Sequence, residues 1–257
     1  MNDFSISFEY NMQNNTENDI LQLPEKIAIE KGIQIVICID EFQQISDFED
    51  SKTFQKKLRS VWQLQQHVSY CLFGSKKHLM NDLFEKKNLP FYKFGDAIYL
   101  AKIETKYWIE YICKRFENTG KHISPELAEE ICRLVDNHSS YVQQLSWLLW
   151  IRTINTATTE QLSYALEDLL DQNNILFQSE TENLSAYQMN FLKAIVDGIH
   201  TKFSSKEVIS KYNLGTSANI VRLKNALLQK ELIETNGKEI VLADPVFGVW
   251  FKKEMLY

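Results

Sequence analysis

The sequence predicts an α/β layer built on a parallel sheet, then an all-α part, then a small C-terminal domain of three helices and a hairpin. Three observations lead to this prediction. Short apolar runs alternate with helical periodicity up to residue 101, and helical periodicity alone follows up to residue 178. Near the end of the chain, an Asn-Gly pair separates two β-type runs.

The first part alternates strands and helices. Residues 5–10 alternate polar and apolar side chains as a short strand does, and residues 20–32 form an amphipathic pattern that ends at Gly32. The apolar run IQIVICID (33–40) is rich in β-branched residues, which predicts a central parallel strand buried on both faces. The same rhythm continues with a helix over 52–67, the apolar run SYCLFGS (69–75), a helix over 77–86 and a strand over 97–100.

From Lys102 onward the pattern is helical, which predicts a helical subdomain. Its helices are expected over 103–116, 124–136, 141–151 and 159–177. The polar, acidic segment QSETEN (178–183) is expected to be a linker. Beyond it, helices over 185–199, 204–212 and 217–230 precede a hairpin at Asn236-Gly237, and three helices with a hairpin make a winged helix. The predicted domains are therefore 1–101, 102–178 and 184–257.

The composition excludes several classes of protein. With 44% hydrophobic and 24% charged residues and only 8 Gly, the chain is neither collagen-like nor disordered. It has no apolar run of ~20 residues and no signal-peptide pattern, so we expect a cytoplasmic protein. Its 4 cysteines form no C-x-x-C pair, which argues against zinc or a disulfide framework and favours buried thiols.

The charge is divided unequally along the chain. Residues 184–257 hold 10 Lys and Arg against 7 Asp and Glu, a net charge of +3, whereas the whole chain has −6. On the expected third helix of the winged helix, Arg222, Lys224 and Lys230 are candidate DNA contacts. The alternative is a winged helix that packs against the rest of the protein. The aromatic residues of this domain are expected in its core: Tyr187, Phe191, Phe247, Trp250 and Phe251.

The segment IQIVICIDE ends in two adjacent carboxylates, Asp40 and Glu41. Ligands of open α/β sheets bind beyond the carboxyl ends of the strands, so both side chains are expected to face a crevice. This is the Walker B arrangement of P-loop NTPases, in which the first acid helps to hold Mg²⁺ and the second activates water. The alternative is a strand that simply ends in polar residues at the solvent.

Further segments resemble the archaeal-type, STAND-like AAA ATPases over nearly the whole chain. They are IVICIDEFQQI, GSKKHLM, LPFYKFGDAIYLAKI and DPVFGVWF. The resemblance implies a partial P-loop NTPase sheet, a helical lid subdomain and a C-terminal winged helix, with ATP and Mg²⁺ as ligands. It implies Asp40 as the magnesium acid, Glu41 as the general base and Ser75 in the sensor-1 region. For Ser75, the alternative is the N-cap of the helix that follows.

The phosphate-binding sequence G-x-x-x-x-G-K-[ST] does not occur in the 257 residues, since Gly120-Lys121 and Gly237-Lys238 lack its other positions. We therefore expect the C-terminal part of a nucleotide-driven switch, from a truncated reading frame, which does not hydrolyse ATP by itself. In ATPases of this class, the strand leading into the P-loop lies between the two strands that here carry Asp40 and Ser75. Unless the sheet closes this gap or another chain fills it, its absence is expected to expose strand edges. The alternatives are a winged-helix binder of DNA or of a partner protein, and a degenerate subunit that binds a partner and no nucleotide.

Overall fold

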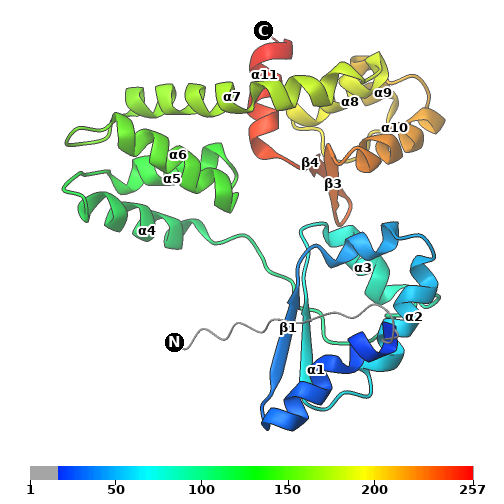
Figure 1. Ribbon diagram of the computed structural model, residues 1–257. Helices are drawn as coiled ribbons and strands as arrows, with labels where there is room; N and C mark the ends of the chain where they lie inside the picture. The colour runs from blue at the N-terminus through cyan, green and yellow to red at the C-terminus, as the bar shows by residue number, and fades with distance from the viewer. Residues whose placement is uncertain (1–16, 257) are drawn as a thin grey trace. The chain divides into compact units, whose positions relative to one another are not determined.

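The computed structural model describes residues 17–256 (Figure 1), so the strand predicted over 5–10 lies outside the described residues. The chain divides into two compact units, one ending at Tyr99 and the other beginning at Leu100. Among the helices of the described residues, none combines the length and the apolar character needed to cross a membrane.

The first unit is an α/β layer. Its elements are α1 (Glu17–Lys31), β1 (Ile35–Ile39), the 3-10 helix η1 (Phe42–Asp47), α2 (Ser51–Trp62), β2 (Val68–Leu72) and α3 (Lys77–Glu85). Strands β1 and β2 are parallel and directly paired, from Ile35 opposite Val68 to Ile39 opposite Leu72. In this chain the sheet therefore has no gap between the two strands. Because they pair directly, the residues that follow each strand lie at the same edge of the sheet.

One face of this sheet packs on an aromatic core. The rings of Trp62 and Tyr70 stack with centroids 4.0 Å apart, and the buried Phe42 and Phe91 meet edge to face at 5.4 Å. Aromatic side chains bury large areas, so this cluster holds α2 and η1 against the strands.

The other face of β1 is open to solvent, which corrects the prediction of a strand buried on both sides. Val36 is 65% exposed, and Cys38 is exposed beside its register partner Cys71, which is also exposed. The prediction of buried thiols is wrong for these two cysteines because successive side chains of a strand point to opposite faces. It is correct for Cys132, where burial raises the pKa of the thiol to about 11.

The segment predicted as a strand over 97–100 has no regular secondary structure. Ile98 is 85% exposed and Leu100 is 93% exposed. A strand exists only where a neighbouring strand takes up its backbone hydrogen bonds, and none of the described residues does so here.

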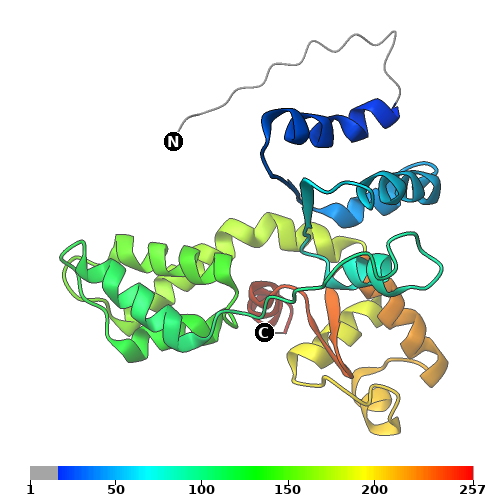
Figure 2. The same cartoon turned by 90° about the horizontal axis from the view of Figure 1, so that it is seen from below.

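The second unit begins with the helical subdomain (Figure 2). It consists of α4 (Thr105–Glu117), α5 (Pro125–Leu134), α6 (Ser139–Arg152) and α7 (Thr159–Glu182). Helix α7 starts at a capping box in which Thr158 and Gln161 satisfy each other's backbone N–H groups. Gln178 to Glu182 belong to this helix, so the linker predicted at 178–183 is wrong.

The rest of this unit contains the three helices and the hairpin predicted for a winged helix. Its elements are α8 (Ala186–Val196), α9 (Lys206–Tyr212), α10 (Ser217–Gln229), β3 (Ile233–Asn236), β4 (Glu239–Leu242) and α11 (Pro245–Leu256). Strands β3 and β4 pair antiparallel about Gly237, whose φ is +61°. Glycine adopts this left-handed conformation without steric cost, which is why the Asn-Gly pair predicts the turn correctly.

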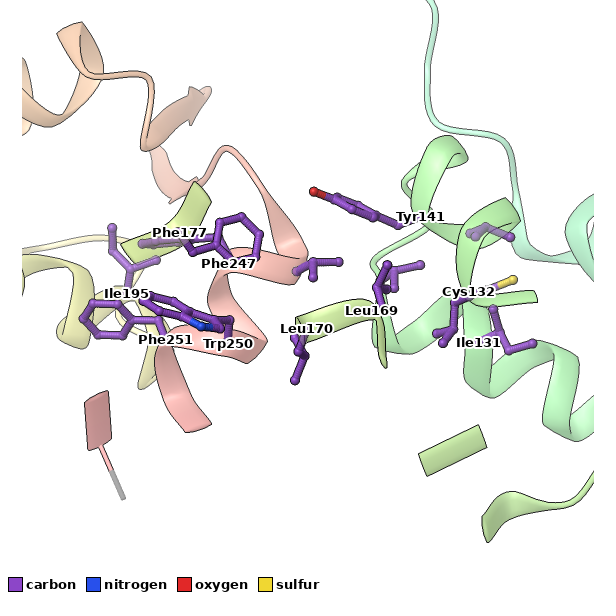
Figure 3. Close-up of a cluster of buried hydrophobic side chains, with 14 of the residues drawn as sticks. Ile131, Cys132, Tyr141, Leu169, Leu170, Phe177, Ile195, Phe247, Trp250 and Phe251 are labelled. Atoms are coloured by element: carbon purple, nitrogen blue, oxygen red, sulfur yellow. The ribbon is translucent and has the colours of Figure 1, made fainter. Parts of the chain in front are cut away.

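A single hydrophobic cluster includes residues from every helix of the second unit from α4 to α11, and Figure 3 shows part of it. Phe177 near the end of α7 meets Phe247 edge to face at 5.4 Å, and the indole of Trp250 donates to Asn174 at 2.8 Å. Phe191, Phe247, Trp250 and Phe251 are buried as predicted, whereas Tyr187 is 45% exposed and lies outside the core.

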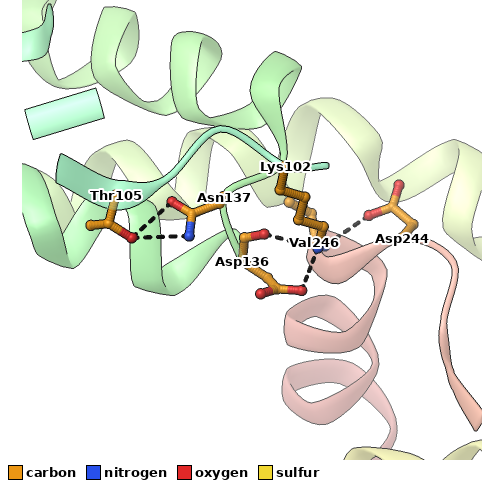
Figure 4. A network of polar contacts seen from close by, with 6 residues as sticks. All are labelled: Lys102, Thr105, Asp136, Asn137, Asp244 and Val246. Atoms are coloured by element: carbon orange, nitrogen blue, oxygen red, sulfur yellow. Dashed lines mark hydrogen bonds and ion pairs between the residues drawn. The ribbon is translucent and has the colours of Figure 1, made fainter. Parts of the chain in front are cut away.

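Polar contacts join α6 to the start of α11. The Tyr141 hydroxyl donates to Asp244 Oδ2, while Asp244 Oδ1 accepts from the backbone N–H groups of Val246, at 2.7 Å, and Phe247. Figure 4 shows the Asp244–Val246 bond and, drawn in the same view, the ion pair between Lys102 Nζ and Asp136 Oδ2, which are 2.6 Å apart. Burial and the nearby Asp244 raise the pKa of Tyr141, so its hydroxyl stays protonated and able to donate.

Candidate functional site

The site forms where β1 and β2 end. The parallel ladder continues past both strands, because Phe73 N donates to Ile39 O and Phe42 N donates to Phe73 O, both at 3.0 Å. Between these anchored residues Glu41 takes a left-handed conformation with φ 49°. A non-glycine residue held in this region costs conformational energy, and such residues are concentrated at functional sites.

The structure brings together Asp40, Glu41 and Ser75, the three candidate site residues of the first unit. Ser75, just after β2, donates its hydroxyl to Glu41 Oε1 at 3.0 Å. Asp40 Oδ1 accepts the backbone N–H of Glu41 at 2.8 Å. The alternative role of Ser75 as a helix N-cap is wrong, since Lys76 occupies the N-cap position of α3.

Gln43 completes the surroundings of Glu41, and sequence reasoning missed it. Its side-chain amide donates to Glu41 Oε2. This hydrogen bond, that of Ser75 and the positive charge of Lys76 together lower the pKa of Glu41. Glu41 is therefore ionised at neutral pH, with both carboxylate oxygens hydrogen-bonded.

A cavity of about 320 Å³ lies against Asp40 and Glu41. The rest of its wall is mainly apolar and includes Leu21, Phe54 and Trp62, and none of the residues that line it is Lys or Arg. A magnesium ion prefers carboxylate oxygens, and phosphates need cations or backbone N–H groups. The residues present thus fit the magnesium side of a nucleotide site, and the described wall of the cavity supplies no cation for the phosphates.

The three basic residues considered for DNA lie in the second unit. Arg222 is exposed on α10, Lys224 is half-buried, and Lys230 is exposed just after the helix ends. On the opposite side of α10, Ile220, Leu223 and Leu227 are buried. The exposed side of the helix is thus available for a partner.

Comparisons with known proteins agree with this architecture. The family model of a probable winged helix domain matches residues 175–253. The Walker-type ATPase paby2304 of Pyrococcus abyssi aligns with 95% of this chain and 72% of its own, with a TM-score of 0.71 and 16% sequence identity. Two looser matches are the ORC2 protein of Aeropyrum pernix and RuvB of Thermotoga maritima. ORC2 aligns over 97% of this chain and 73% of its own, with 13% identity and a TM-score of 0.47. RuvB aligns over 95% of this chain and 76% of its own, with 13% identity and a TM-score of 0.43.

None of the curated proteins compared with this sequence matches it. The similarity in structure shows the fold: an α/β unit with a small parallel sheet, like that of the Pyrococcus abyssi Walker-type ATPase, a helical subdomain and a C-terminal winged helix. The winged-helix match begins at residue 175, within α7. This agrees with the structure, in which α7 continues without a break into the segment before the winged helix.

Proposed function

We propose that the first unit supplies the magnesium and water side of an ATP site, in an ATPase of the Walker type that works as a nucleotide-driven switch. The observation that supports this proposal is the convergence of Asp40, Glu41 and Ser75 at the carboxyl ends of two paired parallel strands. In α/β sheets this edge is where ligands bind.

Each of the three residues has a distinct role in the proposal. Asp40 would hold the magnesium ion, whose charge neutralises the phosphates of a bound nucleotide. Glu41 would accept a hydrogen bond, and then a proton, from the attacking water. Ser75 holds one oxygen of Glu41, and in the proposal it would act as the sensor-1 residue near the terminal phosphate.

A carboxylate with a lowered pKa is a weak base. In the arrangement described here, Glu41 is thus suited to orienting a water molecule, and it becomes a stronger base when one of its two donors turns to another acceptor. The 257 residues contain no P-loop to bind the phosphates, so this chain alone is proposed to bind nucleotide weakly and not to hydrolyse it.

The proposal is tested on the purified chain with Mn²⁺ and ATP, since paramagnetic Mn²⁺ replaces Mg²⁺ and broadens nearby NMR signals even when binding is weak. We expect selective broadening at Asp40 and Glu41, lost in Asp40→Asn and kept in Asp47→Asn, a control that removes the same charge a few residues away in η1. ATP turnover should stay far below ~1 per second. Broadening that Asp40→Asn leaves unchanged, or turnover in the usual enzyme range, would contradict the proposal.

The winged helix supports a second candidate function, the binding of DNA. The exposed side of α10 carries Arg222 and Val221, which is 61% exposed, and Lys230 follows at its end. An exposed helix of a winged helix enters the major groove, while basic side chains contact phosphates. With a net charge of +3 in residues 184–257, we propose a few phosphate contacts and a non-specific dissociation constant of ~10⁻⁴–10⁻⁶ M.

Fluorescence anisotropy with a labelled duplex across a salt series tests DNA binding. We expect binding that weakens as salt rises and that Arg222→Ala with Lys224→Ala reduces. The matched control is Lys252→Ala with Lys253→Ala, which removes the same charge from exposed positions of α11. If the chain shows no salt-dependent binding, or if both pairs of substitutions act equally, the winged helix is a packing or protein-interaction module instead.

A further inference from the structure

Gln43 is the least exposed polar residue beside the acidic site. Only 2% of its surface is exposed, and its amide nitrogen donates to Glu41 Oε2. Its amide oxygen is buried without a hydrogen-bond partner among the described residues. A buried amide that leaves one polar atom unpaired lowers stability, and an apolar side chain of similar size would avoid this cost. Glutamine at this position therefore calls for a role other than filling space.

The neighbouring strand end is shaped around Gln43. At Gly74, a Cβ atom would lie 1.9 Å from Gln43 Oε1, which is closer than two atoms can approach, and 3.0 Å from its Cδ, so the amide of Gln43 would have to move. The backbone of Gly74 does not itself require glycine, since its φ is outside the left-handed region. The missing side chain at Gly74 is the space that Gln43 occupies.

We propose that Gln43 is a positioning residue for Glu41, held in place because Gly74 leaves room for its amide. Ser75 fixes Oε1 of the carboxylate and Gln43 fixes Oε2, so the carboxylate cannot turn about its last torsion angle, which is otherwise soft. Ser75 is itself one donor to Glu41, and the neighbouring Gly74 leaves room for the other donor, Gln43. The segment that follows β2 therefore determines the position of both donors.

This arrangement ties the direction of the Glu41 carboxylate to the pairing of β1 with β2. A shift of either strand end would move Ser75 or Gln43 away from its oxygen and release Glu41. The contribution of Gln43 to catalysis rests on the proposed function of Glu41, whereas the positioning itself is a property of this chain and is measured without nucleotide.

The first test is NMR of the full chain with labelled glutamine side chains. We expect the Gln43 amide protons to exchange with solvent at least about tenfold more slowly than those of the exposed Gln44, and to lose this protection in Glu41→Ala. Gln43→Met should shift the carboxyl carbon signal of Glu41, and the control Gln44→Met should not. Equal exchange at the two glutamines, or a Glu41 signal that Gln43→Met leaves in place, would overturn the proposal.

The second test examines Gly74 through a double-mutant cycle. Gly74→Ala should lower the melting temperature and abolish the protection of the Gln43 amide. In a Gln43→Ala background the added methyl group has room, so the same substitution should change the melting temperature little. The double variant keeps the test informative if Gly74→Ala alone fails to fold. An equal loss in both backgrounds would show that Gly74 does not serve Gln43. Neither test depends on whether the chain binds ATP, so this proposal and the proposed function fail separately.

Discussion

Tyr141→Phe removes one hydroxyl group from the contact that joins α6 to α11. Tyr141 is 9% exposed, and its hydroxyl donates to Asp244 Oδ2. The other oxygen of Asp244 keeps its two backbone donors at the start of α11, so the carboxylate remains in place when the hydroxyl is lost. The substitution leaves the ring and its packing unchanged and therefore isolates one charge-assisted hydrogen bond.

A hydrogen bond to a charged group contributes about 1.5–3 kcal/mol, and the free energy of unfolding should fall by this amount. For a protein of 150–250 residues, each kcal/mol lowers the melting temperature by about 2–4 °C, so the expected decrease is about 3–12 °C. Because Asp244 also caps α11, the loss should appear in the unit that begins at Leu100.

Urea and thermal unfolding, followed by tryptophan fluorescence, measure this change. Tyr164→Phe is the control: it removes the same group from a side chain that is 49% exposed and whose hydroxyl makes a 3.5 Å contact with Glu160. The control should stay within about 0.5 kcal/mol of the unsubstituted protein. If Tyr141→Phe is no more destabilising than the control, the contact between α6 and α11 does not contribute as described.

Three further predictions concern single side chains. Ser75→Ala removes a hydrogen-bond donor from Glu41, so the lowered pKa of that carboxylate should rise in an NMR titration. As the pH falls through that pKa, the variant should therefore lose less free energy of unfolding than the unsubstituted protein does. Burial and the neighbouring carboxylate of Asp244 raise the pKa of Glu180, so its ionised form opposes folding above that pKa. Glu180→Gln should therefore raise the melting temperature at pH 8 but not at pH 4. Gly237→Ala should lower the free energy of unfolding by about 1 kcal/mol, because its φ is +61°, whereas Gly95→Ala, which has open space and no positive φ, should not.

Local patterns predicted most of the elements because they depend on residues close in sequence. The Asn236-Gly237 turn and the strand before Asp40 follow from backbone preference and apolar periodicity. The strand expected over 97–100 and the two buried faces expected for β1 were wrong, because both depend on partners that periodicity does not reveal. The linker expected at 178–183 was wrong because Phe177 and Thr181, one helical turn apart, are buried and continue the inner face of α7.

The convergence of Asp40, Glu41 and Ser75 was predictable because parallel strands carry the residues after them to one edge. Gln43 was not, since nothing in its local sequence indicates that its side chain turns back to Glu41. The sequence does contain one indication of this contact, Gly74, a glycine beside Ser75 whose backbone conformation does not require glycine. Its meaning depends on a contact between residues 31 positions apart, which only the fold reveals.

The most direct test of the proposed function places a strand, a P-loop and a helix upstream of Met1 and compares Glu41→Gln with the unsubstituted extended chain. Glutamine keeps the size of the side chain and one acceptor oxygen, but it replaces the other oxygen with an NH₂ donor and cannot accept the proton of the attacking water. Removal of a general base typically costs about 10²–10⁴-fold in rate. We expect Glu41→Gln to bind ATP as tightly as the unsubstituted chain and to lose hydrolysis to that extent. Hydrolysis at an equal rate in the two proteins would contradict the role of Glu41, and with it the account of this site.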